Sequence, residues 1–218
     1  MSKEIKTFMR IVPLGTDHGV GATLEAVRCL KLGEVVVIPT DTAYGLAADA
    51  LNEKAVQKVF SIKMRGTNQA LPIFVSDFDM LDKVAVASPE LKEYIQQCGS
   101  VTAVLPARGW VPLALRGGKL SVGVRMPSHP FVERLIKAFG GPITGTSANI
   151  SGRGPYYKIR DVIDEFEGGV EPDVVIDAGD LPQNPVSAVI DFTKKPPMIL
   201  RTGMLPKEVL IELLGGEK

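Results

Sequence analysis

The sequence predicts an α/β fold with a mixed sheet and helices on its flanks. Helical patterns alternate with short buried strands through the first two-thirds of the chain, whereas the last third is rich in strands. Hydrophobic residues make up 45% of the 218 positions, which is ordinary for a globular protein. No repeat, linker or low-complexity tract divides the chain, so we predict a single domain over residues 1–218.

The helices are predicted from apolar residues at helical spacing. Leu24, Val27 and Leu30 fall on one helical face, which indicates a helix over 20–32 that Gly33 ends. Another helix begins at Pro89, because proline suits the first turn of a helix. The remaining helical patterns cover 55–60, 131–139, 159–166 and 206–214.

The strands are predicted from short apolar runs rich in β-branched residues. The run 35–38 indicates a strand buried on both faces. Such runs are far shorter than the roughly 20 apolar residues of a membrane helix, so we expect no membrane association. Further strands are predicted over 73–75, 101–105, 122–126, 143–147, 174–176, 187–192 and 198–201.

The composition argues against several classes of protein. Basic and acidic side chains number 25 each, so the formal charge is zero, which is unlike a general polyanion binder. The two cysteines, Cys29 and Cys98, lack the spacing of a zinc site, and two histidines exclude a histidine-rich metal site. The first residues lack the apolar core of a secretory signal, so we expect a cytoplasmic protein.

Two common catalytic motifs fail. Gly118 and Lys119 lack the glycine five residues before Gly118, and Leu120 stands where a phosphate-binding P-loop has Ser or Thr. The segment 145–149 departs from a nucleophile elbow at its last residue. Ser128 precedes the predicted helix 131–139, so we interpret it as an N-cap rather than a nucleophile.

A polar segment at 39–46 directly follows the first buried strand. Thr40, Asp41 and Thr42 offer two hydroxyls and a carboxylate as small donors and acceptors. In open α/β sheets, ligands bind beyond the carboxyl ends of strands, so this segment is a candidate site. The alternative is a capped turn, since Thr and Asp favour such positions, and the residue types alone leave both readings open.

A second polar segment, 145–152, also ends a predicted strand. It is dense in short hydroxyl and amide side chains, and its glycines let a ligand approach the backbone. Such a loop suits phosphate oxygens. Because any polar turn has a similar composition, this segment alone does not decide between a site and a turn.

The basic side chains that could bind an anionic ligand lie in other segments of the chain. Lys63 and Arg65 lie just past the helical pattern 55–60, Arg125 sits in a predicted strand, and Arg201 ends another. Arginine forks match phosphate or carboxylate oxygens in two-point contacts. The alternatives are a solvated loop for Lys63 and Arg65 and a structural ion pair for Arg125.

Taken together, five segments carry a resemblance to a known family. The segments 39–46, 63–65, 124–127, 146–152 and 199–203 occur in the order seen in the YrdC-type threonylcarbamoyl-AMP synthases. The similarity runs from about residue 33 to about residue 214, nearly the whole chain. The chain resembles the single-domain form of this family, without the extra C-terminal domain of the longer members.

The resemblance implies a fold and an activity. The fold is a twisted mixed sheet with flanking helices and a positively charged concave groove. The activity is that of a nucleotidyltransferase, which joins L-threonine, bicarbonate or CO2, and ATP into threonylcarbamoyl-adenylate and pyrophosphate. A separate complex then transfers the threonylcarbamoyl group to a tRNA adenosine. The implied cofactor is Mg²⁺ with ATP, and double-stranded RNA or tRNA is an implied partner.

The resemblance also implies roles for particular residues. In catalysis it implies Lys63, Arg65, Ser147 and Asn149. For ATP binding it implies Lys63, Arg65, Gln69, Asn149, Tyr157 and Arg201. For L-threonine binding it implies Thr42, Phe74, Thr102, Ser147 and Ser187, with Arg125 near the same site. The metal ligands stay unknown, and Asp41 is a weak candidate.

The sequence departs from the family pattern at several positions. Phe74 stands where the family often has histidine, Gln69 where asparagine is usual, and 98–100 replaces a Pro-Gly-Pro turn. Ala188 replaces the threonine of a Ser-Thr pair, and 155–157 replaces a Ser-Pro-Thr-like turn. These changes leave two alternatives open, which are a paralogue with altered amino-acid specificity and a non-catalytic module that binds double-stranded RNA. The zero net charge and the 6% aromatic content disfavour the RNA-binding module.

Overall fold

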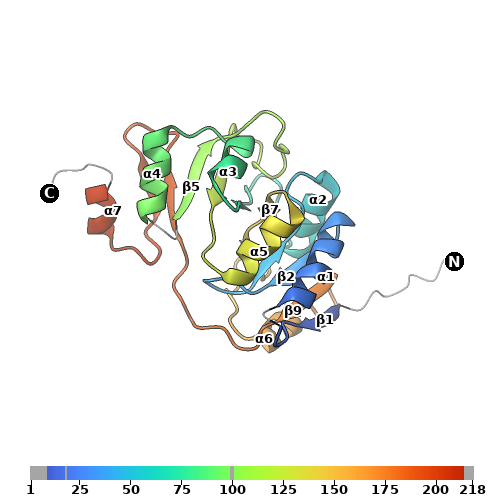
Figure 1. Ribbon diagram of the computed structural model, residues 1–218. Coiled ribbons are helices and arrows are strands. Elements are labelled where there is room, and N and C mark those ends of the chain that lie inside the picture. The colour runs from blue at the N-terminus through green and yellow to red at the C-terminus, as the bar shows by residue number, and fades with distance from the viewer. Residues whose placement is uncertain (1–8, 18, 99–100, 214–218) are drawn as a thin grey trace.

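Two mixed β-sheets with helices around them form the fold (Figure 1). The computed structural model describes residues 9–17, 19–98 and 101–213. The strands are β1 (Arg10–Pro13), β2 (Val36–Ile38), β3 (Gly45–Ala47), β4 (Ile73–Phe74), β5 (Val101–Pro106), β6 (Ser121–Arg125), β7 (Ile143–Thr144), β8 (Thr146–Ser147), β9 (Val174–Asp177), β10 (Ala188–Asp191) and β11 (Met198–Arg201). The helices are α1 (Val20–Lys31), α2 (Glu53–Ile62), α3 (Phe78–Val84), α4 (Pro89–Cys98), α5 (Pro130–Phe139), α6 (Ile159–Phe166) and α7 (Lys207–Leu213).

The predicted fold class is confirmed, and the strands divide between two sheets. The first sheet has the order β1-β9-β2-β3-β8, in which β1, β9 and β2 run parallel and β3 and β8 pair antiparallel. The second sheet has the order β11-β10-β5-β6-β4-β7. Its central register sets Thr102 of β5 opposite Arg125 of β6 and opposite Val189 of β10.

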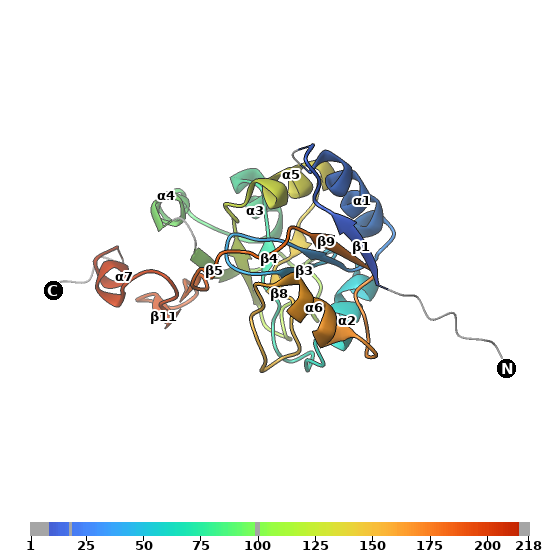
Figure 2. The same ribbon diagram turned by 90° about the horizontal axis from the view of Figure 1, so that it is seen from below.

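Helices cover both faces of the first sheet. Figure 2 shows α1 and α5 on one side of β1, β9 and β3, and α2 and α6 on the other. All three residues of β2 are buried, as the apolar run 35–38 predicts for a strand covered on both faces. No helix in the described part of the chain is long and apolar enough to cross a bilayer.

The predicted strand 143–147 is in fact two strands in different sheets. The chain leaves the second sheet after β7, passes through Gly145 and enters the first sheet at β8. The Gly145 N–H donates to the Pro72 carbonyl at 2.8 Å, and a Cβ at Gly145 would overlap the Phe74 ring. A residue with a side chain does not fit this crossing point, so glycine is required.

The prediction that Ser128 caps the helix after it is wrong. The N-cap of α5 is His129, which makes no side-chain capping bond, and Pro130 occupies the first turn. The Ser128 hydroxyl instead donates to Asp41 Oδ2 at 3.2 Å. Ser128 therefore supports the 39–46 segment rather than the helix.

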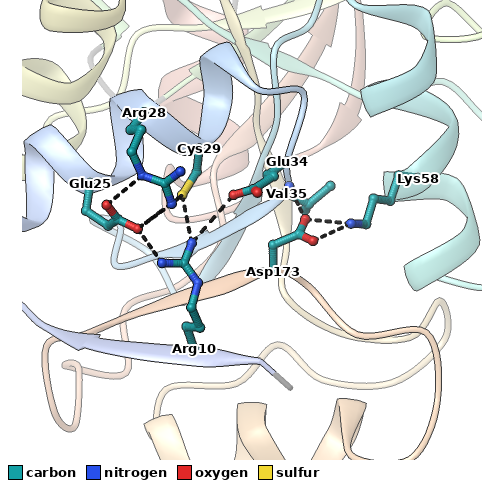
Figure 3. Close-up of polar contacts among 8 residues, drawn as sticks. All are labelled: Arg10, Glu25, Arg28, Cys29, Glu34, Val35, Lys58 and Asp173. Carbon is teal, nitrogen blue, oxygen red and sulfur yellow. Dashed lines mark hydrogen bonds and ion pairs between the residues drawn. The ribbon is translucent and has the colours of Figure 1, made fainter. Parts of the chain in front are cut away.

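A network of ion pairs and hydrogen bonds ties β1 to α1 (Figure 3). Arg10 and Arg28 contact Glu25 Oε1 at 2.6 and 2.8 Å. Hydrogen bonds from Arg28 and Arg10 lower the pKa of Glu25 to about 2. Burial raises the pKa of the neighbouring Cys29 thiol to about 12, so this cysteine is not a nucleophile near neutral pH.

The same view shows a second ion pair that joins α2 to the first sheet. The Lys58 ammonium lies 2.5 Å from one carboxylate oxygen of Asp173, and the other oxygen accepts the Val35 N–H at 2.7 Å. Asp173 directly precedes β9, and Val35 directly precedes β2. The carboxylate therefore fixes the starts of two parallel strands relative to α2.

Candidate functional site

A cavity of about 900 Å³ lies where the two sheets meet. Nine residues with predicted roles line it, namely Thr42, Arg65, Gln69, Phe74, Thr102, Arg125, Ser147, Ser187 and Arg201. Among the described residues of the lining, five side chains are basic and one, Asp191, is acidic. The predicted segments therefore converge on one cavity, and its lining favours an anionic ligand.

Lys63 lies beneath the cavity wall rather than in the lining. Its side chain is 2% exposed, and its Nζ donates to the carbonyls of Ser147 at 2.5 Å and Asn149 at 2.9 Å. Burial, with a smaller contribution from the Arg65 charge, lowers the pKa of Lys63 to about 7. The alternative that Lys63 lies in a solvated loop is therefore wrong, because its side chain is buried.

The turn after α2 explains why Lys63 and Arg65 point to different places. Asn52 caps the start of α2 by accepting two backbone N–H bonds, and Lys63 ends the helix. Met64 then has φ +48°, a left-handed conformation that turns the chain sharply. As a result Lys63 faces the protein interior and Arg65 lines the cavity.

Arg65 is held at the cavity edge by one backbone contact. Its Nη2 donates to the Ala70 carbonyl at 2.8 Å, and burial lowers the pKa of Arg65. Its Nε is buried and has no hydrogen-bond partner among the described residues. Arg65 therefore combines a fixed position with a donor that a ligand can use.

Arg125 makes a buried ion pair and also lines the cavity. Its Nη2 lies 2.6 Å from Asp41 Oδ2, its Nη1 lies 3.5 Å from Thr42 Oγ1, and its guanidinium stacks 5.7 Å from the centre of the Phe74 ring. Burial lowers the pKa of Arg125, and Asp41 acts in the opposite direction. The structural ion pair that the sequence left as an alternative for Arg125 is therefore present, with Asp41 as its partner, and Arg125 also lines the cavity.

Two hydroxyls and an arginine form the opposite part of the cavity. The Thr102 and Ser187 hydroxyls lie 3.0 Å apart and are 7% and 5% exposed as whole residues. Arg201 donates from Nε to the Ser187 carbonyl at 3.0 Å. A Cβ at Gly203 would overlap the backbone at 187–188, so this glycine lets the chain pass close behind Ser187.

Asn149 and Tyr157 do not reach the described lining of the cavity. Asn149 is 5% exposed, and its amide donates to the carbonyls of Ile150 at 2.7 Å and Arg153 at 2.5 Å. Its Oδ1 has no partner in the described part of the chain. The Tyr157 hydroxyl donates instead to the Asn184 carbonyl at 3.3 Å.

The family departures fall at different places. Phe74 lines the cavity, and Ala188 is fully buried and lies outside the described lining. The side chain of Cys98 and the residues 99–100 lie outside the described residues. The change at Phe74 therefore touches the cavity, whereas the change at Ala188 affects the core.

The sequence reasoning missed residues at the other end of the cavity. The missed residues are Lys119, Ser121, Gly123, Asp191, Thr193 and Lys194. Ser121 and Gly123 precede Arg125 on β6 at two-residue spacing, and alternate residues of a strand share one face. Applying this two-residue alternation from Arg125 toward the start of the strand would have identified Ser121 and Gly123 as lining residues.

A metal site built from protein carboxylates is absent from the part of the chain that the structure describes. No three or more His, Cys, Asp or Glu residues gather there as a metal site would require. Asp41, the weak candidate, contacts Arg125 and Ser128 with the same oxygen. The residues present therefore do not fit a dedicated magnesium cage.

Comparison with known proteins places the chain in a family. The Sua5/YciO/YrdC family model, described as "Telomere recombination", matches residues 28–203. The chain belongs to the Sua5/YciO/YrdC family. A curated threonylcarbamoyl-AMP synthase of Pyrococcus abyssi is 38% identical over 193 residues, which are 87% of this chain and 56% of that protein. A putative threonylcarbamoyl-AMP synthase of Methanocaldococcus jannaschii is 34% identical over 182 residues, covering 82% of this chain and 84% of that one.

Solved structures of this family share the fold. The crystal structure of P. abyssi Sua5 complexed with L-threonine has a TM-score of 0.85 and 34% identity, over 97% of this chain and 62% of that one. Escherichia coli YciO has a TM-score of 0.82 at 23% identity, over 95% and 100% of the two chains, and supports the fold alone. This chain spans about half the length of the P. abyssi and Bacillus subtilis synthases that it matches.

Proposed function

We propose that this protein is an L-threonylcarbamoyladenylate synthase. The observation that carries the proposal is the single cavity that brings Arg65 and Arg201 together with the hydroxyls of Thr102 and Ser187. Relatives named threonylcarbamoyl-AMP synthase, and a family member solved with L-threonine, support it. The substrates are L-threonine, bicarbonate or CO2, and ATP.

The nucleotide occupies the part of the cavity near Arg65 and Ser147. Arg65 offers a buried Nε donor, and Arg201 adds a second guanidinium whose pKa burial lowers. Lys63 contributes through the wall, because its Nζ donates to the backbone carbonyls on either side of Ala148. Gln69 also lines the cavity, as does Pro155. Tyr157 lies outside the described lining, and its contact with the nucleotide stays a prediction.

The amino acid occupies the part of the cavity lined by Arg125 and the hydroxyl pair. Arg125 and Thr42 recognise its carboxylate, and Thr102 and Ser187 exchange their mutual bond for bonds to its polar groups. The Asp41 contact fixes the guanidinium plane before the substrate arrives. Phe74 closes this part with an apolar ring.

The chemistry requires positioning rather than a covalent protein intermediate. The threonine amine attacks CO2 to form a carbamate and releases a proton. A carbamate oxygen then attacks the α-phosphorus of ATP, and the bond to the β-phosphate oxygen breaks with loss of pyrophosphate. Two anions must approach each other, so cationic side chains aimed at the phosphates lower the barrier.

Several parts of this function stay predictions. Mg²⁺ would enter with ATP, held by phosphate oxygens and water, since Asp41 is engaged with Arg125. The cytoplasmic location, the tRNA threonylcarbamoyl-transfer complex that would use the product, and binding of double-stranded RNA or tRNA are likewise expectations. A second candidate function is the same reaction with another amino acid, which the apolar Phe74 in the cavity favours.

The decisive experiment is analysis of products from the purified protein. We expect pyrophosphate and threonylcarbamoyl-adenylate only when ATP, bicarbonate and threonine are all present. Mass spectrometry with a mixed amino-acid pool separates this function from the second candidate, because the adenylate reveals which amino acid was used. Pyrophosphate release that is independent of any amino acid would refute both.

A point variant tests the cavity assignment. Arg65→Ala removes one charge-assisted contact, which is typically about 1.5–3 kcal/mol, or roughly 10-fold to 100-fold in ATP affinity. Arg108→Ala is the matched control, since Arg108 is exposed and lies outside the described lining. Equal ATP affinity in the two variants would remove Arg65 from the site.

A further inference from the structure

Glu165 lies outside the described cavity lining, and its buried carboxylate accepts hydrogen bonds from three donors. The Glu165 side chain on α6 is 5% exposed. Its Oε1 accepts the Ile150 N–H at 2.9 Å, and its Oε2 accepts from the Tyr156 hydroxyl at 3.0 Å and from Arg153 at 3.1 Å. Burial alone would raise the pKa of Glu165, but these donors hold it below its usual value.

All three donors belong to one segment, 150–156, which directly follows Asn149. The Asn149 amide donates to the carbonyls of Ile150 and Arg153 in the same segment. The Ile150 residue is thus held at its N–H by Glu165 and at its carbonyl by Asn149. Glu165 and Asn149 therefore hold the 150–156 segment from two sides, and the segment in turn fixes the orientation of the Asn149 side chain.

The same segment connects to the cavity wall at two further points. The Tyr156 carbonyl accepts the N–H of Tyr44, and both Tyr44 and Pro155 line the cavity. The Ser151 N–H donates to the Lys63 carbonyl at 2.9 Å. Displacement of the segment would therefore move the wall that Lys63 supports.

We propose that Glu165 is a positioning residue for the nucleotide side of the site. Its ionised carboxylate fixes the 150–156 segment, so that the Asn149 amide and the carbonyls held by Lys63 keep one arrangement behind the Ser147 part of the cavity wall. The ionised form is needed because three donors converge on two oxygens. Glutamine has one acceptor oxygen and a donor amide, so it cannot satisfy all three. This proposal rests on the proposed function.

The test compares Glu165→Gln with Asp164→Asn. Asp164 is the adjacent residue on α6, and its half-exposed carboxylate contacts Arg160 on the same helix. We expect Glu165→Gln to fold and to lower kcat/KM for ATP by about tenfold to a hundredfold, with KM for threonine nearly unchanged. Asp164→Asn should match the wild type. Tyr156→Phe, which removes one of the three donors, should give a smaller loss in the same direction.

Binding of a non-hydrolysable ATP analogue, measured by calorimetry, keeps this test separate from the proposed function. If the wild type releases no pyrophosphate, the proposed function fails, and weaker analogue binding by Glu165→Gln still supports the positioning role. Amide exchange at Ile150 should accelerate in Glu165→Gln. Wild-type analogue affinity together with wild-type kcat/KM in that variant would overturn the inference, as would equal losses on the ATP and threonine sides.

Discussion

Replacement of Lys63 by methionine is expected to change how stability depends on pH. The amine is buried under the Ser147 and Asn149 carbonyls, and its pKa falls from 10.5 to about 7 because burial disfavours the charge. Between these two values the unfolded chain holds a proton that the folded chain has lost. Raising the pH through this window therefore adds stability to the folded wild type, and the destabilisation contributed by the buried Lys63 charge is complete below about pH 7.

The magnitude follows from this pKa difference. Each pH unit inside the window contributes up to about 1.4 kcal/mol of unfolding free energy. From pH 7.5 to 9.5 the wild type should gain about 2–3 kcal/mol relative to Lys63→Met, which has no ionisable group there. Methionine has a similar length but also removes the two hydrogen bonds to the carbonyls, so the change of the difference with pH, rather than its size at one pH, reports the charge.

Urea unfolding of both proteins at the two pH values measures this difference. Other lysines titrate in both proteins and cancel in the comparison. Lys54→Met is the matched control for the loss of a lysine, since Lys54 is exposed on α2. A wild-type minus Lys63→Met difference that stays constant within about 0.5 kcal/mol would show that Lys63 keeps an ordinary pKa, and the reasoning would fail.

Three further predictions concern the scaffold. Gly145→Ala should lower the unfolding free energy by about 1–3 kcal/mol and weaken ligand binding, because the new methyl overlaps the Phe74 ring; unchanged thermal unfolding would contradict this. Met64→Val should cost about 1–2 kcal/mol, since a β-branched residue resists φ +48°, whereas Met64→Gly should be close to neutral in the same urea titration. The unfolding free energy of the wild type should fall as the pH drops from about 4.5 toward 2, because Glu25 is protonated there and its contact with Arg28 weakens. The unfolding free energy of Glu25→Gln should depend less on pH over that range.

The sequence was most informative where an element carries its own apolar pattern. The helix 159–166 and the strand 198–201 were predicted with the bounds that the structure has. Strand β1 was missed because its four residues are mostly exposed, and its conformation depends on pairing with β9 far along the chain. Helix α3 was missed because it is short, although Asp77 caps it.

Within the site, the sequence predicted most of the cavity lining but not the depth of each residue. Lys63 and Arg65 are two positions apart and looked equivalent, yet one is buried and the other lines the cavity. The difference arises from the left-handed turn at Met64 and from the Ser147 carbonyl, which belongs to a distant segment. Neither is visible in local composition, since both depend on tertiary contacts.

Gly145, one of the points where the chain passes from one sheet to the other, has a consequence for dividing the protein. The segment before it contributes Thr102 and Arg125 of the second sheet to the cavity, and the segment after it contributes Ser147 of the first sheet and Ser187, which directly precedes β10. Neither half of the molecule can be produced alone with a complete binding surface. Permuted or split versions should therefore be cut elsewhere, in exposed turns far from this junction.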